Sequence, residues 1–232
     1  MVRLLRAGTK LSLILALLVS IQSCRAPPSL PSRDDLTAGP PGAVLFRVDS
    51  VRSQAWLYLH SDGPLARLGH SHVIVTHGLR GSVWIHPQLD LSSCDLRLPV
   101  DTWVVDDPQE RTNAGGEFTL PLDAAARQGT REHMLADQQL NAKVFPEMRL
   151  RCTHVRAAGE GVRLDLTVTL RGRDVSLAAP VNWQRDGNNF QASGEFLFKQ
   201  TELGMEPYSA LLGALRVADQ IRARFVIMAH AH

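Results

Sequence analysis

Hydrophobic and polar residues alternate along four stretches of the chain between Val162 and Ala229. In three of these stretches the apolar residues of one parity are Val175, Leu177, Ala179, Val181 and Trp183, then Phe190, Ala192, Gly194, Phe196 and Phe198, then Ile221, Ala223, Phe225, Ile227 and Ala229. A period of two is typical of a β-strand with one buried and one solvated face. Successive antiparallel strands of this kind must cover their apolar faces, and they can do so by closing into a barrel.

Further strand patterns lie upstream of these stretches. The predicted strands are 43–48, 55–60, 70–85 with a break near Gly78 and Gly81, 94–104, 148–155, 162–170, 174–183, 190–199 and 221–229. Glycines inside strands often mark the bends or bulges that a barrel needs in order to close. The sequence therefore predicts an all-β protein, an antiparallel up-and-down β-barrel of about eight strands with a short helical insertion.

The insertion lies between the strands 94–104 and 148–155. A short helix is predicted over 130–140, with Thr130 as its N-cap and three apolar residues, Met134, Leu135 and Leu140, on one side. We expect this segment to cover one mouth of the barrel. The long connection 202–219 is expected to be partly helical around 209–215.

The N-terminal region has the features of a secretory signal. Residues 1–10 carry three basic side chains, and residues 11–21 are apolar apart from two serines, which is too short a stretch to span a bilayer comfortably. The segment ends Ile21-Gln22-Ser23-Cys24, which resembles the bacterial lipobox and predicts lipidation of Cys24. The alternative is an ordinary signal peptide with a cysteine near its cleavage site.

These features divide the chain into a lipoprotein-type signal peptide (1–23), a proline-rich tether (24–42) and a barrel domain (43–232). A lipid anchor at Cys24 predicts an exported, periplasm-facing lipoprotein. Because Arg25 rather than aspartate follows the cysteine, the outer membrane is favoured over the inner membrane.

The charge balance argues against a nucleic-acid partner. The full chain has a formal net charge of +2, and removing residues 1–23 takes away three positive charges, which leaves a nearly neutral protein. A nucleic-acid-binding surface would call for a basic face.

Two cysteines remain in the predicted barrel. Cys94 has the parity of Leu96 and Leu98, and Cys152 has the parity of Leu150, so both side chains should face inward. An exported protein meets an oxidising environment, in which a disulfide can form if the two strands are neighbours. Strand parity does not determine the separation of the Cα atoms, so two buried thiols are an equally good prediction.

The order of several motifs resembles the YceI-like family over residues 43–229. These motifs are HGLRGSVWI, LPVDTWVVDD, REHMLADQQLNAKVFPEMRLRC, LDLTVTLRGRDVSLAAPVNW and GEFLFKQTELGM. The resemblance implies an extended lipocalin-like barrel that holds an isoprenoid lipid, of the polyprenyl or quinone type, in an apolar tunnel. The sequence departs from the family at RLGHSH (67–72), at the loop that precedes it, and in the long connection 202–219.

On this interpretation the inward aromatic residues form the ligand-binding wall of the tunnel. They are Trp183, Phe190, Phe196, Phe198 and Phe225. The alternative is that the same side chains fill a solid core, and alternation alone does not distinguish the two. No cofactor is certain, and a bound polyisoprenoid or isoprenoid quinone is the candidate ligand.

Two histidines suggest a second function. His70 and His72 are two residues apart, so on a strand they would share one face and could bind one metal ion, although further ligands would be needed. The competing interpretation places them at the rim of the barrel, in a structural role or in contact with a ligand headgroup. A periplasmic metal-binding or redox accessory protein is therefore an alternative function.

No motif of a known enzyme class is present. The sequence has no G-x-S-x-G elbow and no H-E-x-x-H helix, and the neighbouring carboxylates Asp106 and Asp107 are expected to be solvated in a loop. We therefore expect a binding protein rather than an enzyme. A non-catalytic module that contacts another envelope protein is the third alternative, and the sequence leaves a homodimer open.

Overall fold

A computed structural model describes residues 39–231 of the chain, and all structural statements below concern these residues. The predicted signal peptide, Cys24 and most of the tether lie outside them. The strands are β1 (Val44–Val48), β2 (Gln54–Asp62), β3 (His72–Thr76), β4 (Arg80–Ile85), β5 (Ser93–Pro99), β6 (Val104–Val105), β7 (Glu147–Ala158), β8 (Gly161–Leu170), β9 (Arg173–Asp186), β10 (Asn189–Lys199), β11 (Ser209–Ala210) and β12 (Leu215–Ala231).

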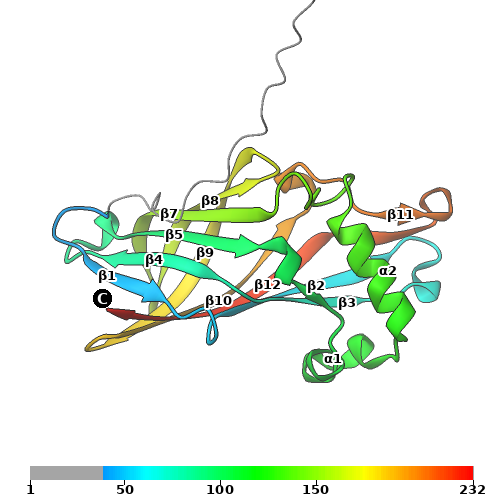
Figure 1. The fold of residues 1–232 in the computed structure, drawn as a ribbon, viewed down its shortest axis with the longest axis horizontal. Coiled ribbons are helices and arrows are strands. Elements are labelled where there is room, and N and C mark those ends of the chain that lie inside the picture. The colour runs from blue at the N-terminus through cyan, green and yellow to red at the C-terminus, as the bar shows by residue number, and fades with distance from the viewer. Residues whose placement is uncertain (1–38, 232) are drawn as a thin grey trace, which may run out of the picture. The chain divides into compact units, whose positions relative to one another are not determined.

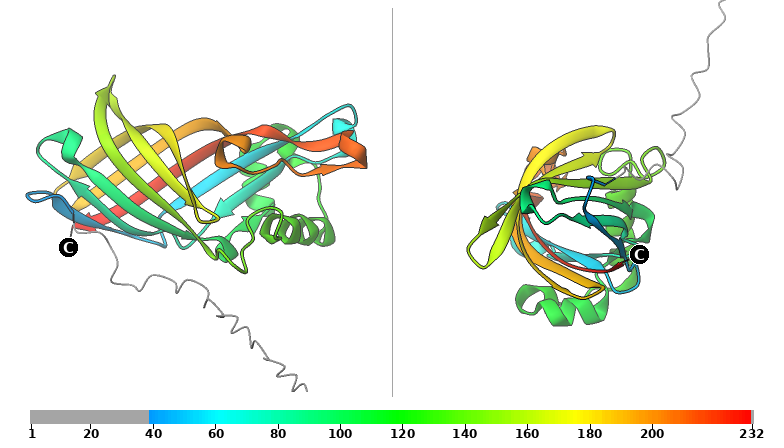
Figure 2. Two further views of the ribbon diagram at one scale, coloured as in Figure 1. Left: turned by 90° about the horizontal axis from the view of Figure 1, so that it is seen from above. Right: turned by 90° about the vertical axis from the view of Figure 1, so that its left-hand side faces the viewer.

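The strands form one antiparallel sheet that closes into a barrel (Figures 1 and 2). Going round the ring, the order is β1, β4, β5, β7, β8, β9, β10 and β12, and β12 pairs with β1 again. This is the predicted antiparallel up-and-down barrel of eight strands.

Three of the eight barrel positions are occupied by interrupted strands. The edge of β12 that faces away from β10 pairs with β2 over Arg216–Val226 and with β1 over Ala229–Ala231. In the same way β3 continues the position of β4, and β6 continues that of β5. The short strands β2, β3 and β6 therefore extend one end of the barrel.

The predicted break near Gly78 and Gly81 is confirmed, because β3 ends at Thr76 and β4 begins at Arg80. Gly81 has a φ of 137°, and a Cβ atom there would lie 2.1 Å from the carbonyl oxygen of Asp95. The backbone of β4 thus approaches β5 at a point where only glycine fits.

The helices differ from the prediction. The α-helices are α1 (Pro108–Ala114) and α2 (Ala124–Leu135), and the 3-10 turns are η1 (Ala66–Leu68), η2 (Leu89–Leu91), η3 (Val100–Thr102), η4 (Gly116–Thr119), η5 (Thr201–Leu203) and η6 (Leu211–Gly213). The helix predicted over 130–140 begins six residues earlier, because the side chain of Asp123 accepts a hydrogen bond from the backbone N–H of Ala126 and caps it. It ends at Leu135 because Ala136 is extended.

The connection around 209–215 contains one 3-10 turn, η6, between β11 and β12. Tyr58, Val73 and Val75 of β2 and β3 form a small outer cluster under Phe118 of η4. None of the helices in the described part of the chain is long and apolar enough to cross a membrane.

Candidate functional site

The interior of the barrel contains an elongated cavity of about 370 Å³. Its wall comes from the inward-facing positions of β2 to β5, β7 to β10 and β12, together with α2 and the segment 200–208. A cavity of a few hundred cubic ångströms lined mainly by apolar side chains is typical of a small-molecule binding site. The apolar face of the sheet therefore encloses a tunnel as well as a core.

All five predicted ligand-binding aromatic residues line this cavity. They are Trp183, Phe190, Phe196, Phe198 and Phe225. Phe190 and Phe198 are buried, whereas Trp183 is 36% exposed. Trp183 stacks on Phe190 with ring centroids 6.0 Å apart, and the ring of Phe46 packs against that of Phe190 with centroids 5.5 Å apart. Trp183 thus stands at one end of the tunnel.

Polar side chains gather at the opposite end, beside α2. The polar lining residues of this end are His72, Thr130, His133, Gln139, Gln200 and Tyr208. The rings of His133 and Tyr208 stack with centroids 4.9 Å apart, and the Gln139 side chain donates a 3.0 Å hydrogen bond to the carbonyl oxygen of Glu206. These contacts join α2 and the turn after it to the segment that follows β10. As predicted, the helical insertion covers one mouth of the barrel.

The described lining of the cavity contains no lysine, arginine, aspartate or glutamate. Its polar groups are hydroxyls, amides, imidazoles and the indole N–H groups of two tryptophans. Such a lining can donate and accept hydrogen bonds, but it supplies no fixed charge to neutralise an anionic group.

The two barrel cysteines form a disulfide in the wall of the tunnel. Cys94 and Cys152 lie directly opposite one another in the pairing of β5 with β7, and their Cα atoms are 4.7 Å apart. Of the two predicted states, the structure contains the bridge. Both residues line the cavity, as their strand parity indicates.

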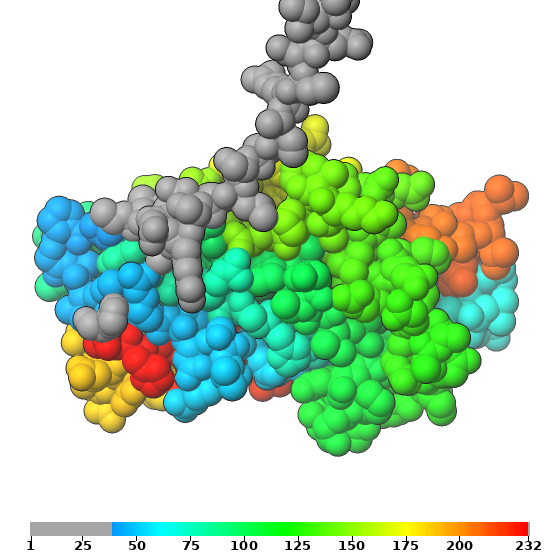
Figure 3. Space-filling view, in the orientation of Figure 1, coloured from blue at the N-terminus to red at the C-terminus, as the bar shows by residue number. Residues whose placement is uncertain are grey.

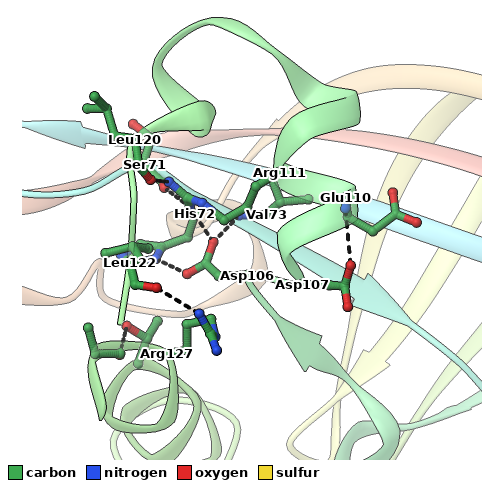
Figure 4. A network of polar contacts seen from close by, with 12 residues as sticks. Ser71, His72, Val73, Asp106, Asp107, Glu110, Arg111, Leu120, Leu122 and Arg127 are labelled. Carbon is green, nitrogen blue, oxygen red and sulfur yellow. Dashed lines mark hydrogen bonds and ion pairs between the residues drawn. The ribbon is translucent and has the colours of Figure 1, made fainter. Parts of the chain in front are cut away.

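His70 and His72 do not lie on one strand, as the parity argument had assumed. β3 begins at His72, so His70 lies in the preceding loop, where it is exposed. His72 instead donates a 2.6 Å hydrogen bond from Nδ1 to Oδ2 of Asp106 (Figure 4). Within residues 39–231 no group of three or more histidine, cysteine, aspartate or glutamate side chains is arranged to hold a metal ion.

Asp106 is the centre of a buried polar network that the sequence analysis missed. Its carboxylate has no exposed surface and accepts hydrogen bonds from His72, from the backbone N–H of Val73 at 2.9 Å and from Nη1 of Arg111 at 2.6 Å. Burial raises the pKa of Asp106, but the hydrogen bonds from His72, Val73 and Arg111 outweigh it and hold this pKa below its ordinary value.

The expectation that Asp106 is solvated is therefore wrong, and α1 is the reason. Asp107 caps this helix by accepting from the backbone N–H groups of Gln109 and Glu110, and Pro108 occupies its first turn. The helix carries Arg111 inward, where it also donates to the carbonyl oxygens of Ser71 and Leu120. The Asp-Pro pair was the sequence signal that could have revealed this helix.

The backbone ladder between β9 and β10 is incomplete. Residues 189–193 of β10 pair with residues 182–186 of β9, and beyond this ladder both strands continue without pairing to each other. Pro180 has no N–H to donate at this point, and a Cβ atom on Gly194 would lie 2.4 Å from the carbonyl oxygen of Pro180. A second hollow of about 420 Å³ lies over the unpaired part and shares Leu177, Phe196 and Phe198 with the tunnel wall.

Comparisons with known proteins agree with this architecture. The family model described as YceI-like domain matches residues 71–229. Among solved structures, BcnA of Burkholderia cenocepacia is 12% identical, with 78% of this chain and 98% of that chain covered and a TM-score of 0.57. A polyisoprenoid binding domain from Saccharophagus degradans, implicated in plant cell wall breakdown, is 13% identical, with coverage of 82% and 99% and a TM-score of 0.54.

A YCEI protein of Campylobacter jejuni is 12% identical, with 68% of this chain and 84% of that chain covered and a TM-score of 0.50. The comparison with curated proteins found no match to this chain. At these identities the likeness to solved structures shows the fold.

Proposed function

The chain belongs to the YceI-like domain family, and we propose that it binds a long isoprenoid-type lipid inside its barrel. The observation on which this proposal depends is the cavity, whose wall is mainly apolar. Burying apolar surface stabilises a complex by about 25 cal/mol per Å² before ordering costs, so an extended hydrocarbon gains from entering this space. The polyisoprenoid-binding relative from Saccharophagus degradans supports the same ligand class.

We infer that the lipid enters with its headgroup toward α2. Phe190, Phe196 and Phe225 would then contact the hydrocarbon chain, and His133, Gln139 and Tyr208 would face the headgroup. A diphosphate would need positive side chains to offset its desolvation, and none lines the cavity among the described residues. This arrangement favours an uncharged headgroup, such as a quinone ring or an alcohol.

Binding rather than catalysis is the role that this geometry supports. Asp106 accepts three hydrogen bonds from within the protein, so its carboxylate is engaged in holding β3 to α1. The proposed carrier is tethered to the bacterial cell envelope through lipid on Cys24, with residues 25–42 as its tether.

Native mass spectrometry of the protein purified from its own membranes tests the ligand proposal. We expect a bound species that is released on unfolding and has the mass of an isoprenoid quinone or alcohol. Purified protein that carries no lipid, and that fails to take up such a lipid from detergent micelles, would contradict the proposal. A bound metal lost in a His70→Ala, His72→Ala variant would favour the accessory-protein alternative instead.

A variant of the polar mouth tests the orientation of the ligand. His133→Leu places an apolar side chain of similar length beside Tyr208 and removes the imidazole hydrogen-bonding groups. We expect weaker binding of a quinone or alcohol and unchanged binding of a hydrocarbon of the same length. The matched control is His230→Leu, because His230 is outside the cavity lining and bonds Asn189. Equal losses for both ligands would contradict the proposed orientation.

A further inference from the structure

Two neighbouring loops project from the α2 end of the barrel and carry exposed leucines. One loop, residues 63–71, joins β2 to β3, and the other, residues 211–214, joins β11 to β12. The backbone N–H of Leu65 donates a 2.9 Å hydrogen bond to the carbonyl oxygen of Ala214, so the loops lie side by side. We call these two loops the leucine tip. It is the cyan and orange projection at the right of Figures 1 and 3.

The leucines of the tip are unusually exposed for their type. The relative exposure is 36% for Leu65, 68% for Leu68, 61% for Leu211 and 109% for Leu212. Single exposed leucines are common on protein surfaces, but four on two adjoining loops form a cluster. Arg67, also exposed, lies beside Leu68 and adds a positive charge to the cluster.

The backbone of the tip is strained at two of these exposed leucines. Leu211 and Leu212 both have positive φ values, 50° and 55°. A leucine in this left-handed region costs about 1–3 kcal/mol, whereas glycine or asparagine would adopt it readily. The strain persists because the base of the loop is held by the Leu65 to Ala214 bond and by the Val217 N–H, which donates to the carbonyl oxygen of Tyr208.

The tip is continuous with the polar mouth of the tunnel. Tyr208 and Val217 flank the loop of Leu211 and Leu212, and both of them line the cavity. A surface that covered the leucine tip would therefore lie next to the end of the tunnel at which the headgroup is placed.

We propose that the leucine tip inserts into the surface of a lipid bilayer, from which the tunnel receives its ligand. Leucine side chains bind the boundary between headgroups and acyl chains in proportion to the apolar area they bury, and Arg67 would lie among anionic headgroups. A partner protein fits this surface less well, because a stable interface needs about 800 Å² per partner and the tip offers two narrow loops. The inference rests on the proposed lipid ligand, since it supplies the route by which that ligand is loaded.

An environment-sensitive fluorophore on the tip tests insertion directly. The full chain carries Cys24→Ser, so that a label enters only at a new cysteine, while Cys94 and Cys152 remain bridged. One sample has Leu212→Cys. The control has Leu91→Cys, because Leu91 is 44% exposed in η2 at the other end of the barrel. Both are mixed with vesicles of phosphatidylethanolamine and phosphatidylglycerol that carry a lipid-bound quencher.

We expect a blue shift and strong quenching at position 212 and little change at position 91. Equal signals at the two positions, or a signal at 212 that appears without vesicles when the chain self-associates, would overturn the proposal. The second result would identify another copy of the chain as the partner of the tip.

Transfer kinetics separate this inference from the proposed function. The probe is retinol, a fluorescent isoprenoid alcohol, and the variants are Leu211→Asn with Leu212→Asn, and Leu91→Asn as the control. Asparagine tolerates a positive φ, so the tip variant should fold at least as stably as the wild type. We expect transfer of retinol from vesicles to slow at least about tenfold in the tip variant alone, since it loses the apolar area of two leucines.

Binding of retinol delivered in detergent should be the same in all three proteins. Equal transfer rates from vesicles in the three proteins would overturn the role of the tip and leave the binding function intact. A wild type that does not bind retinol from detergent would contradict the binding function for this ligand, and the fluorophore at position 212 would still decide whether the tip inserts.

Discussion

Cys94 and Cys152 are bonded to one another from directly opposite positions on β5 and β7, with their Cα atoms 4.7 Å apart. The bridge closes a segment in which the two cysteines are 58 residues apart, and this segment contains β6, α1 and α2. It therefore joins β5 to β7 at the end of their ladder that lies away from the helical insertion, because the insertion leaves and returns at the paired residues Pro99 and Glu147.

Removing this bridge should destabilise the barrel. For a loop of this length the chain-entropy estimate is about 4 kcal/mol, although measured values are often smaller. We expect Cys94→Ala with Cys152→Ala to lower the free energy of unfolding in urea by about 2–4 kcal/mol. The wild type measured with and without a reductant is the control, and an unfolding midpoint that is unchanged by reduction would contradict the structural role of the bridge.

Asp106→Asn should destabilise the protein by about 3–5 kcal/mol, because it leaves the buried Arg111 guanidinium without a compensating charge. The matched control is Asp107→Asn, one residue further along. Asparagine caps a helix about as well as aspartate, so this variant should unfold at nearly the wild-type urea concentration. Similar losses in both variants would show that the network does not depend on the charge of Asp106.

The lowered pKa of Asp106 predicts a contribution to stability that is lost at acid pH. Because the pKa of Asp106 is lowered in the folded protein by hydrogen bonds that outweigh the effect of burial, the unfolded chain binds a proton more readily. Asp106 therefore makes its full contribution to stability above the ordinary aspartate pKa of about 4. This contribution is lost as the pH falls through the lower pKa that Asp106 has in the folded protein. The difference in unfolding free energy between wild type and Asp106→Asn should shrink toward acid pH. A difference that stays constant from neutral to acid pH would contradict this assignment.

A larger side chain in the tunnel wall should select shorter ligands. Ala223 is buried in the lining, where it faces Phe196 across the pairing of β10 with β12. We expect Ala223→Phe to lower the amount of the longest lipids that co-purify with the protein. Overpacking should also destabilise the variant by about 1–3 kcal/mol. Leu197→Phe is the control, since Leu197 is 58% exposed and is not part of the tunnel lining. An unchanged distribution of lipid masses would argue that the lipid does not occupy this part of the cavity.

The mass of the mature protein tests the predicted lipid anchor. The mature protein should begin at Cys24 and carry the added mass of acyl chains, and Cys24→Ser should abolish this mass. Several acyl chains on one residue hold a protein to a bilayer firmly, because each buried methylene contributes about 0.8 kcal/mol. Intact-mass measurement is preferred to fractionation, since the leucine tip also predicts reversible membrane contact. An unmodified N-terminus would rule out the anchor.

The sequence predicted the barrel and its aromatic wall correctly because strand alternation is a local property. Trp183, Phe190 and Phe225 belong to runs in which side chains must point alternately to the two faces of the sheet, whatever their distant neighbours are. Where the evidence was a single polar residue, the prediction failed. Thr130 appeared to be a helix cap, but it lies inside α2 and its hydroxyl donates to the carbonyl oxygen of Ala126.

Long-range pairing decided the remaining features. Alternation placed Cys94 and Cys152 on inward faces, but only the register of β5 against β7 set them opposite each other. The sequence around Asp106 is typical of a solvated loop, and only the fold shows that α1 brings Arg111 into contact with Asp106.

The sequence by itself thus determined an antiparallel sheet with one apolar face, because the period of two is encoded residue by residue. Only the tertiary structure decided that this face encloses a cavity with a polar mouth, and that four leucines stand beside that mouth. The closure of the ring, the unpaired edges of β9 and β10 and the position of α2 depend on contacts between residues far apart in the chain, and no local pattern specifies these contacts.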